Sequence, residues 1–298
     1  MEQHQTVCAI LVRSLLPCAK GILSWARCFL FIFPCVQMFS AEESFLLIDG
    51  VTSETVCSLG VNIYRRVHPC STFKIALSLM GFDAGILKDV TTPTWNFQEG
   101  YENYLEVWKV PQTPRSWMKY SCVWYSQLLR SQLGLEKVQS YLESFEYGKQ
   151  EMSRGVTEEW LRSCLKISPK EQVDFIRKMV QGSLPVSKHA CQMTKDILFL
   201  EELNGWKLFG KTGWGGPVGD SNGKSLEIAW FVGWVEKDDV FFPFAYNIRE
   251  KNINLERRMP RVKQLLGKAN LLNVSLLKAR DSYPSEQLQG QSIRKNPK

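Results

Sequence analysis

The stretch HPCSTFK (residues 68–74) is followed directly by the apolar run IALSLMGF. That run has helical spacing, so the serine and the lysine lie where a loop becomes a buried helix. Residues three apart on a helix share one face, which places Lys74 beside the hydroxyl of Ser71 and partly out of water. Such a pair can activate a serine nucleophile. Taken alone, the stretch is more readily explained by a serine that caps a helix and a lysine on the surface.

Strands are predicted on both sides of this helix. SFLLIDG (44–50) and ETVCSLG (54–60) are two short strands joined by a turn. Near the other end, WKLFGKTGW (206–214), SLEIAWFVGWVEK (225–237) and DVFFPFAYNI (239–248) are rich in aromatic and β-branched residues, with turn residues between them. They predict a three-stranded antiparallel meander.

The segment between these strands, residues 75–205, is predicted to be mostly helical. KYSCVWYSQLLRSQLG (119–134) has helical spacing and a glycine stop, and the pattern continues over 136–145. A helix over 168–180 opens with a serine, a proline and a glutamate, and another is predicted over 194–203. A last helix is predicted over 255–267, after the meander.

This order of elements predicts an α+β fold, an α/β sandwich. The early strands join the late meander in one antiparallel sheet flanked by helices, and the helical block forms an inserted all-helical subdomain. We expect this catalytic domain to span residues 42–267.

The two ends of the chain differ from that domain. Arg27 precedes CFLFIFPCVQMFSA, an apolar run that ends in small residues, and two glutamates follow. Residues 1–41 are therefore predicted to be a secretory signal peptide cleaved after Ala41, with an uncleaved membrane anchor as the alternative. Residues 268–298 lose their periodicity and are predicted to be a flexible tail.

Composition narrows the functional classes. The 298 residues are 44% hydrophobic and 22% charged, which is typical of a globular protein with a substantial core. The formal charge of +7 is scattered and accompanies no nucleic-acid motif, so we expect no nucleic-acid partner. The nine cysteines include no C-x-x-C spacing, and no metal site is expected. The sequence leaves any disulfide open.

Three short motifs occur in order along the chain: Ser71-Thr72-Phe73-Lys74, Ser121-Cys122-Val123 and Lys211-Thr212-Gly213. Each is weak alone, since S-x-x-K also occurs at 163–166 and 275–278. An active-serine enzyme needs a nucleophile, a base, a proton relay and an anion clamp, and the three motifs supply candidates for these roles.

With these motifs, the chain resembles the penicillin-recognising serine enzymes, and more closely the class D, oxacillinase-type β-lactamases. The class D pattern is STFK, then S-x-V, then KTG. The segments EEWLRSCLKISPKEQVDFI and IAWFVGWVEKDDVFFPFAYNI are also similar to that family. The resemblance covers about residues 44–267.

The resemblance implies that Ser71 attacks the lactam carbonyl and forms an acyl-enzyme. Lys74 would be carboxylated by carbon dioxide, and the carbamate would act as general base. That chemistry needs an uncharged amine, and burial favours one because desolvation lowers a lysine pKa. Phe73 and Val123 would supply apolar walls, and the indole N–H of Trp160 would hold the carbamate.

Further roles follow from the same resemblance. The backbone N–H groups of Ser71 and Trp214 would form the oxyanion hole. Ser121 would relay a proton to the leaving nitrogen, and Lys211 would assist that step electrostatically.

The carboxylate of the substrate would be bound by Thr212, beside Gly213 in the substrate-binding set, and by an arginine of the last helix. Both Arg257 and Arg258 fit by position, and we favour Arg258. The family usually has Tyr-Gly-Asn on a wall of the cleft, where this chain has Tyr147-Gly148-Lys149. A cation therefore replaces an amide, which bears on substrate range and turnover.

The function expected from the sequence is a periplasmic or secreted β-lactamase that hydrolyses penicillins. It would need no cofactor beyond carbon dioxide for Lys74. It would act as a monomer or homodimer without stable membrane association after cleavage of the leader. Two alternatives stay open: the sensor domain of a β-lactam receptor, and a transpeptidase or carboxypeptidase that acylates without efficient turnover.

Overall fold

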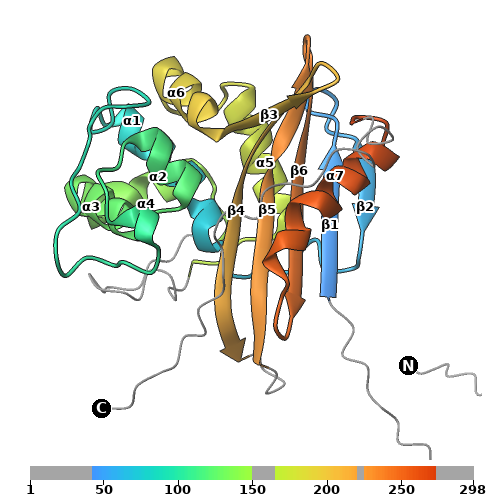
Figure 1. Ribbon diagram of the computed structural model, residues 1–298. Helices are drawn as coiled ribbons and strands as arrows, with labels where there is room; N and C mark the ends of the chain where they lie inside the picture. Colours follow the sequence, from blue (N-terminus) through green and yellow to red (C-terminus); the bar gives the residue numbers. More distant parts are fainter. Residues whose placement is uncertain (1–41, 150–164, 220–224, 273–298) are drawn as a thin grey trace, which may run out of the picture. The chain divides into compact units, whose positions relative to one another are not determined.

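The computed structural model describes residues 42–149, 165–219 and 225–272. These residues belong to one compact unit, built on a six-stranded antiparallel sheet with the strand order β2-β1-β6-β5-β4-β3 (Figure 1). The predicted joining of the early strands to the late meander is confirmed, because β1 pairs along β6. The strands are β1 Glu42–Ile48, β2 Thr55–Leu59, β3 Phe199–Leu203, β4 Trp206–Gly219, β5 Ser225–Lys237 and β6 Val240–Glu250.

Helices lie on both faces of this sheet (Figure 1). Helix α5 lies behind the central strands and α7 lies in front of them, while α1 to α4 gather beside the end of the sheet that β4 and β3 form, as the predicted helical insertion requires. The helices are α1 Lys74–Asp83, α2 Pro114–Tyr120, α3 Val123–Leu133, α4 Leu135–Ser144, α5 Pro169–Val180, α6 Lys188–Leu198 and α7 Arg258–Lys268.

The predicted helix over 119–134 is wrong in one respect: it is two helices. Helix α2 ends at Tyr120, and α3 begins at Val123. Ser121 adopts a left-handed conformation with φ 58° and caps α2, which breaks the helical path. The start of α2 carries a signal that the spacing analysis missed, a capping box on Thr113 followed by Pro114.

The predicted helix over 194–203 is also wrong in its second half. Helix α6 stops at Leu198, and the chain continues as strand β3. Leu203 and Trp206 are paired across the two-residue turn Asn204-Gly205, and both turn residues have positive φ. Asn-Gly between apolar residues is the strongest short hairpin signal, and this local hairpin pairing overrides the helical spacing before it.

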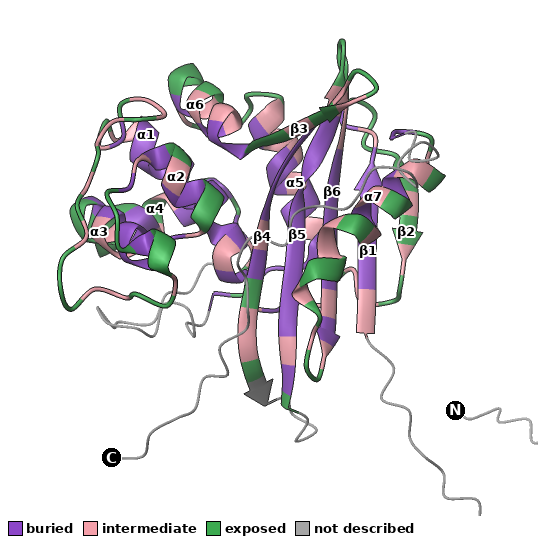
Figure 2. Cartoon of the chain, viewed as in Figure 1, coloured by how far each residue is buried: buried purple, intermediate pink, exposed green. Residues whose placement is uncertain are grey.

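Two apolar clusters fill the faces of the sheet, and β5 contributes to both. Along β5, Trp230, Val232 and Trp234 pack into the cluster beneath the helical block. The alternating residues Phe231 and Val235 pack into the cluster beneath α7. This two-sided burial is visible as the purple central strands in Figure 2. It explains why β5 reads as an almost continuous apolar run.

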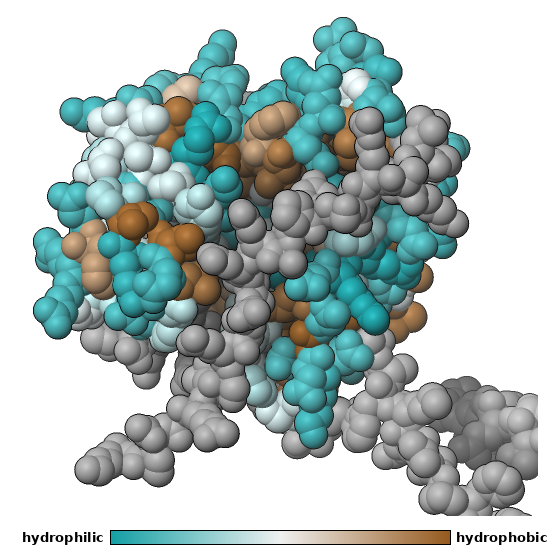
Figure 3. All heavy atoms as spheres, in the orientation of Figure 1, coloured by the Kyte–Doolittle hydropathy of each residue, from teal (hydrophilic) through white to brown (hydrophobic). Residues whose placement is uncertain are grey.

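The packed structure extends a few residues past the last predicted helix. Leu271 and Leu272 are buried against the cluster under α7. On the face shown in Figure 3, hydrophobic side chains form separate small patches among hydrophilic ones. Among the described residues, no helix has both the length and the apolar character needed to cross a bilayer.

Candidate active site

Ser71 lies in a tight turn that leads into the central helix of the site. Residues Cys70–Phe73 form a 3₁₀ turn, and Cys70 has a left-handed φ of 52°. The carbonyl oxygen of Pro69 accepts two hydrogen bonds from Thr72, one from the backbone nitrogen at 3.2 Å and one from the hydroxyl at 2.6 Å. Ser71 is thereby held just before the N-terminus of α1. It is partly exposed, whereas its neighbours Cys70 and Thr72 are buried.

Lys74 is the first residue of α1, and its side chain is completely buried. Its Nζ donates to Ser71 Oγ at 3.4 Å, so the pairing predicted from the three-residue spacing is confirmed. Burial lowers the pKa of Lys74 from 10.5 to about 8, and the thiols of Cys70 and Cys122 oppose this only in part. The alternative of a surface lysine is therefore wrong, because the structure places the amine inside the core beside the serine.

Ser121 and Val123 lie on either side of Cys122 at the break between α2 and α3. Ser121 is half-buried and its backbone N–H bonds Trp117 O, whereas Val123 is buried as the first residue of α3. The buried thiol of Cys122 interacts electrostatically with Lys74, so the break between α2 and α3 lies near the first motif.

The third motif lies on β4, which runs directly against the Ser71 turn. A Cβ atom added at Gly213 would lie 3.1 Å from Pro69 O and 3.2 Å from Thr72 N. A side chain at this position would be in tight contact with the turn, and the strand and the turn would have to move apart by a few tenths of an ångström. The structure therefore brings together two motifs that are about 140 residues apart in the chain.

Lys211 is almost completely buried at this junction, and its Nζ donates to Thr212 O at 2.9 Å. Burial holds its pKa well below the ordinary value, and repulsion from Lys74 and Arg258 lowers it further. Thr212 is half-buried, and Trp214 is exposed with its indole N–H 3.1 Å from Glu227 Oε2. The site thus holds two desolvated amines beside an accessible serine.

The structure distinguishes between the two candidate arginines near the start of the last helix. Arg258 is partly buried and donates from Nη1 to Gly213 O at 2.7 Å and from Nε to Leu255 O at 2.9 Å. Burial lowers its pKa to about 10. Arg257 is exposed. Arg258 is therefore the one that reaches the third motif.

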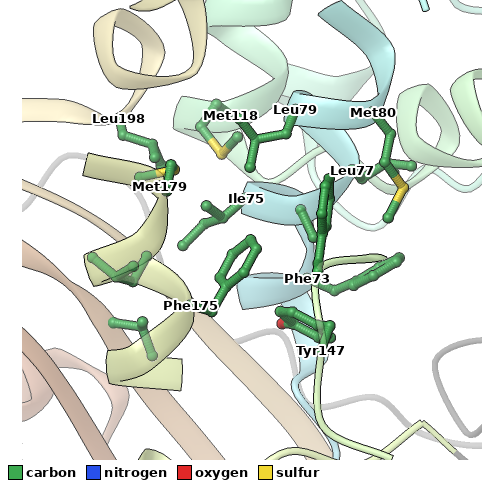
Figure 4. Close-up of a cluster of buried hydrophobic side chains, with 14 of the residues drawn as sticks. Phe73, Ile75, Leu77, Leu79, Met80, Met118, Tyr147, Phe175, Met179 and Leu198 are labelled. Carbon is green, nitrogen blue, oxygen red and sulfur yellow. The ribbon is translucent and has the colours of Figure 1, made fainter. Parts of the chain in front are cut away.

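Tyr147 lies in the core between α1 and α5, not on a cleft wall as expected. It is fully buried, with its ring edge-on to Phe73 at 5.8 Å and to Phe175 at 4.9 Å between centroids (Figure 4). Phe73 is buried with it and faces this aromatic cluster. Lys149 is exposed, and its backbone N–H bonds Lys166 O at 2.7 Å.

Trp160, which the resemblance assigns to holding the carbamate, lies outside the described residues. The sequence analysis missed Gln172 of α5, which is fully buried and reaches the Ser71 turn through Thr72. Its only sequence signal was its place on the buried face of a well-capped helix. The described part of the chain holds no group of three metal-ligating side chains.

The chain is similar to known proteins over most of the domain described above. Residues 60–267 match the penicillin binding protein transpeptidase domain family. The chain is 40% identical to the β-lactamase OXA-9 of Klebsiella pneumoniae over 216 residues, which are 67% of this chain and 76% of that protein. It is 39% identical to the β-lactamase OXA-1 of Escherichia coli over 202 residues, 65% of this chain and 71% of that one.

A solved structure shows the same likeness in three dimensions. The crystal structure of the class D β-lactamase OXA-427 superposes with a TM-score of 0.70 at 37% sequence identity, covering 76% of this chain and 97% of that chain. Sequence and structure therefore point to the same family as the three motifs.

Proposed function

The chain belongs to the class D β-lactamases, and we propose that it hydrolyses penicillins through an acyl-enzyme on Ser71, with Lys74 carrying the general base. Enzymes of this class are β-lactam hydrolases, so the reaction type follows from membership. The substrate, the covalent intermediate and the state of Lys74 are the parts that we propose.

The observation that carries this proposal is the complete burial of Lys74 with its Nζ 3.4 Å from Ser71 Oγ. A pKa of about 8 leaves a substantial fraction of the amine neutral near physiological pH. A neutral amine adds to carbon dioxide and releases one proton, which gives a carbamate. The site suits such an anion, since Arg258, whose pKa of about 10 keeps it charged near neutral pH, interacts electrostatically with Lys211, as Lys74 does.

The carbamate on Lys74 supplies a base that accepts the proton of Ser71 Oγ and later that of the hydrolytic water. Ser71 Oγ attacks the lactam carbonyl, the C–N bond of the ring opens, and the nitrogen takes a proton, for which Ser121 is the proposed relay. Lys211 offsets the negative charge that develops in this step. The backbone N–H groups of Ser71 and Trp214 are proposed to bind the oxyanion.

Thr212, Gly213 and Arg258 are proposed to bind the carboxylate of the drug. Arg258 is held against this strand by its hydrogen bond to Gly213 O, which supports its assignment over Arg257. Trp160 is proposed to donate its indole N–H to the carbamate, on the resemblance alone. Export to the periplasm or the medium is proposed on the leader-like residues 1–41.

The test is hydrolysis of a penicillin and a chromogenic cephalosporin, with and without added bicarbonate, while mass spectrometry follows the protein. We expect sustained turnover that rises with bicarbonate, and a transient adduct of the drug's mass on Ser71. Turnover that is indifferent to bicarbonate after the carbon dioxide has been removed would contradict the role of Lys74.

A second candidate function is acylation without efficient turnover, as in a β-lactam sensor or a penicillin-binding transpeptidase. Two observations favour it: the family match is named for a transpeptidase domain, and Lys149 stands where class D enzymes usually have asparagine. The same experiment separates the two, because a stable adduct on Ser71 without turnover would support the second candidate.

A further inference from the structure

Gln172 lies in helix α5 and reaches the Ser71 turn from the buried interior. Its side chain is fully buried, and its Nε2 donates to Thr72 Oγ1 at 2.9 Å. The Thr72 hydroxyl in turn donates to Pro69 O at 2.6 Å. A buried hydrogen-bond chain therefore runs from α5 through Thr72 to the residue that opens the turn.

The direction of this chain follows from the donors available. A carbonyl oxygen can only accept, and a hydroxyl has one proton, so the Thr72 proton is committed to Pro69. Gln172 must then present its NH₂ group to Thr72, which is the orientation in the structure. Each hydrogen bond in the chain depends on the other, because neither Thr72 nor Gln172 is exposed to water.

The turn needs such support because its backbone is strained. Cys70 has φ 52°, in the left-handed region that residues with a side chain adopt only at an energetic cost. Thr72 also receives the close approach of Gly213, with Thr72 Cγ2 3.2 Å from a Cβ built there. Thr72 is thus held from α5 by Gln172 and approached from β4 by Gly213.

We propose that Gln172, acting through Thr72, is a positioning residue that fixes the Ser71 turn so that Ser71 Oγ faces Lys74 Nζ at the distance acylation requires. This inference rests on the proposed function, because it concerns how the same serine is aimed. Gln172 itself touches neither the substrate nor the reacting atoms. Its effect is on the rate of acylation and not on the affinity for the drug.

The test measures the first-order acylation constant and the apparent dissociation constant of a penicillin by rapid mixing and mass spectrometry. We expect Thr72→Val and Gln172→Met each to slow acylation about 10- to 100-fold, the range that a small misplacement of a nucleophile produces. The dissociation constant should stay within about twofold of the wild-type value. The double variant should be no slower than the slower single variant, and Thr72→Ser should restore most of the rate.

A matched control lies in α1, one turn after Lys74. Ser78 Oγ and Thr194 Oγ1 form a hydrogen bond of 3.2 Å between α1 and α6, and both residues are fully buried. Thr194→Val removes a comparable buried hydroxyl contact away from the turn, and its acylation constant should remain within about threefold of wild type. Thermal unfolding of all variants shows whether the losses of stability are comparable.

The inference would be overturned if Thr72→Val and Gln172→Met acylate no more slowly than Thr194→Val. It would also be overturned if the apparent dissociation constant of the penicillin rises by the same factor as acylation slows. If Thr72→Val does not fold, Gln172→Met decides the question, since it leaves the turn residues intact. Failure of the wild-type protein itself to form an adduct on Ser71 would instead contradict the proposed function. The two failures are therefore distinguishable.

Discussion

The cations of the site and the cations on the surface of α7 differ in what they bind. In the site, Lys74 donates to a hydroxyl and Lys211 to a carbonyl. On α7, Arg261 makes two hydrogen bonds to Glu43, and Lys263 lies 2.7 Å from Glu201. Burial lowers the pKa of both site lysines, which have no carboxylate partner among the described residues, whereas the pKa of Arg261 is raised, chiefly by its hydrogen bond to Glu43. Desolvation makes an amine reactive, and pairing keeps a cation charged and inert.

The largest effect is expected from removing the amine of the site. Lys74→Met should lower turnover about 10²- to 10⁴-fold, the range for loss of a general base, while the free energy of unfolding stays the same or rises. Steady-state hydrolysis and thermal unfolding measure the two quantities. Lys263→Met on α7 is the control and should leave turnover within about twofold. If turnover in Lys74→Met stays within tenfold of wild type, the buried lysine is no more important for the reaction than the paired cations of α7.

The second prediction concerns pH and the stability of the apoprotein without carbon dioxide. The pKa of Lys74 is about 8 in the folded chain against 10.5 for an ordinary lysine. Between these values the unfolded chain binds a proton that the folded chain does not, so stability rises with pH across this window. Relative to Lys74→Met, the wild type should gain about 3 kcal/mol from pH 8 to 10.5. Denaturant titrations at several pH values measure this, and a constant difference would contradict it.

The third prediction concerns the contact between β4 and the Ser71 turn. Gly213→Val places its Cβ and methyl groups against Pro69 O and Thr72 N, so the turn must shift. We expect acylation about 10- to 100-fold slower. Gly216→Val on the same strand is the control, since a Cβ there meets nothing within 4 Å. Similar rates in both variants would show that the close approach does not matter for the site.

The smallest effect is expected from a paired surface cation. Arg261→Ala should cost about 0.5 kcal/mol of stability and leave turnover unchanged, because the ion pair with Glu43 is partly exposed. Arg261 lowers the pKa of Glu43 below 4.5, so this stability is present above pH 4.5 and is lost as the pH falls through the lowered pKa. Urea unfolding at pH 7 and at pH 3 measures it. A loss of more than about 2 kcal/mol in the free energy of unfolding at pH 7 would contradict the prediction that this surface ion pair contributes little.

Much of the fold was predictable wherever the signal was local. The helix start at Ser168 and Pro169 formed as its capping residues predict, and the glycine stop of α3 lies at Gly134. The predictions failed at Ser121 and at β3, where a left-handed residue and pairing with β4 override helical spacing. The helical spacing of a single segment accounts for neither, although the Asn204-Gly205 turn that starts the pairing with β4 is itself a local signal.

The sequence by itself determined the family, the order of the motifs and the pairing of Ser71 with Lys74, because a spacing of three on a helix is a local geometric fact. Only the tertiary structure decided that Lys74 is desolvated, that Arg258 and not Arg257 reaches Gly213, and that Tyr147 is a core residue. It also decided that Gln172 supports the turn from α5. Burial and convergence depend on which distant segments cover a residue, and that is settled when the sheet and the helices pack.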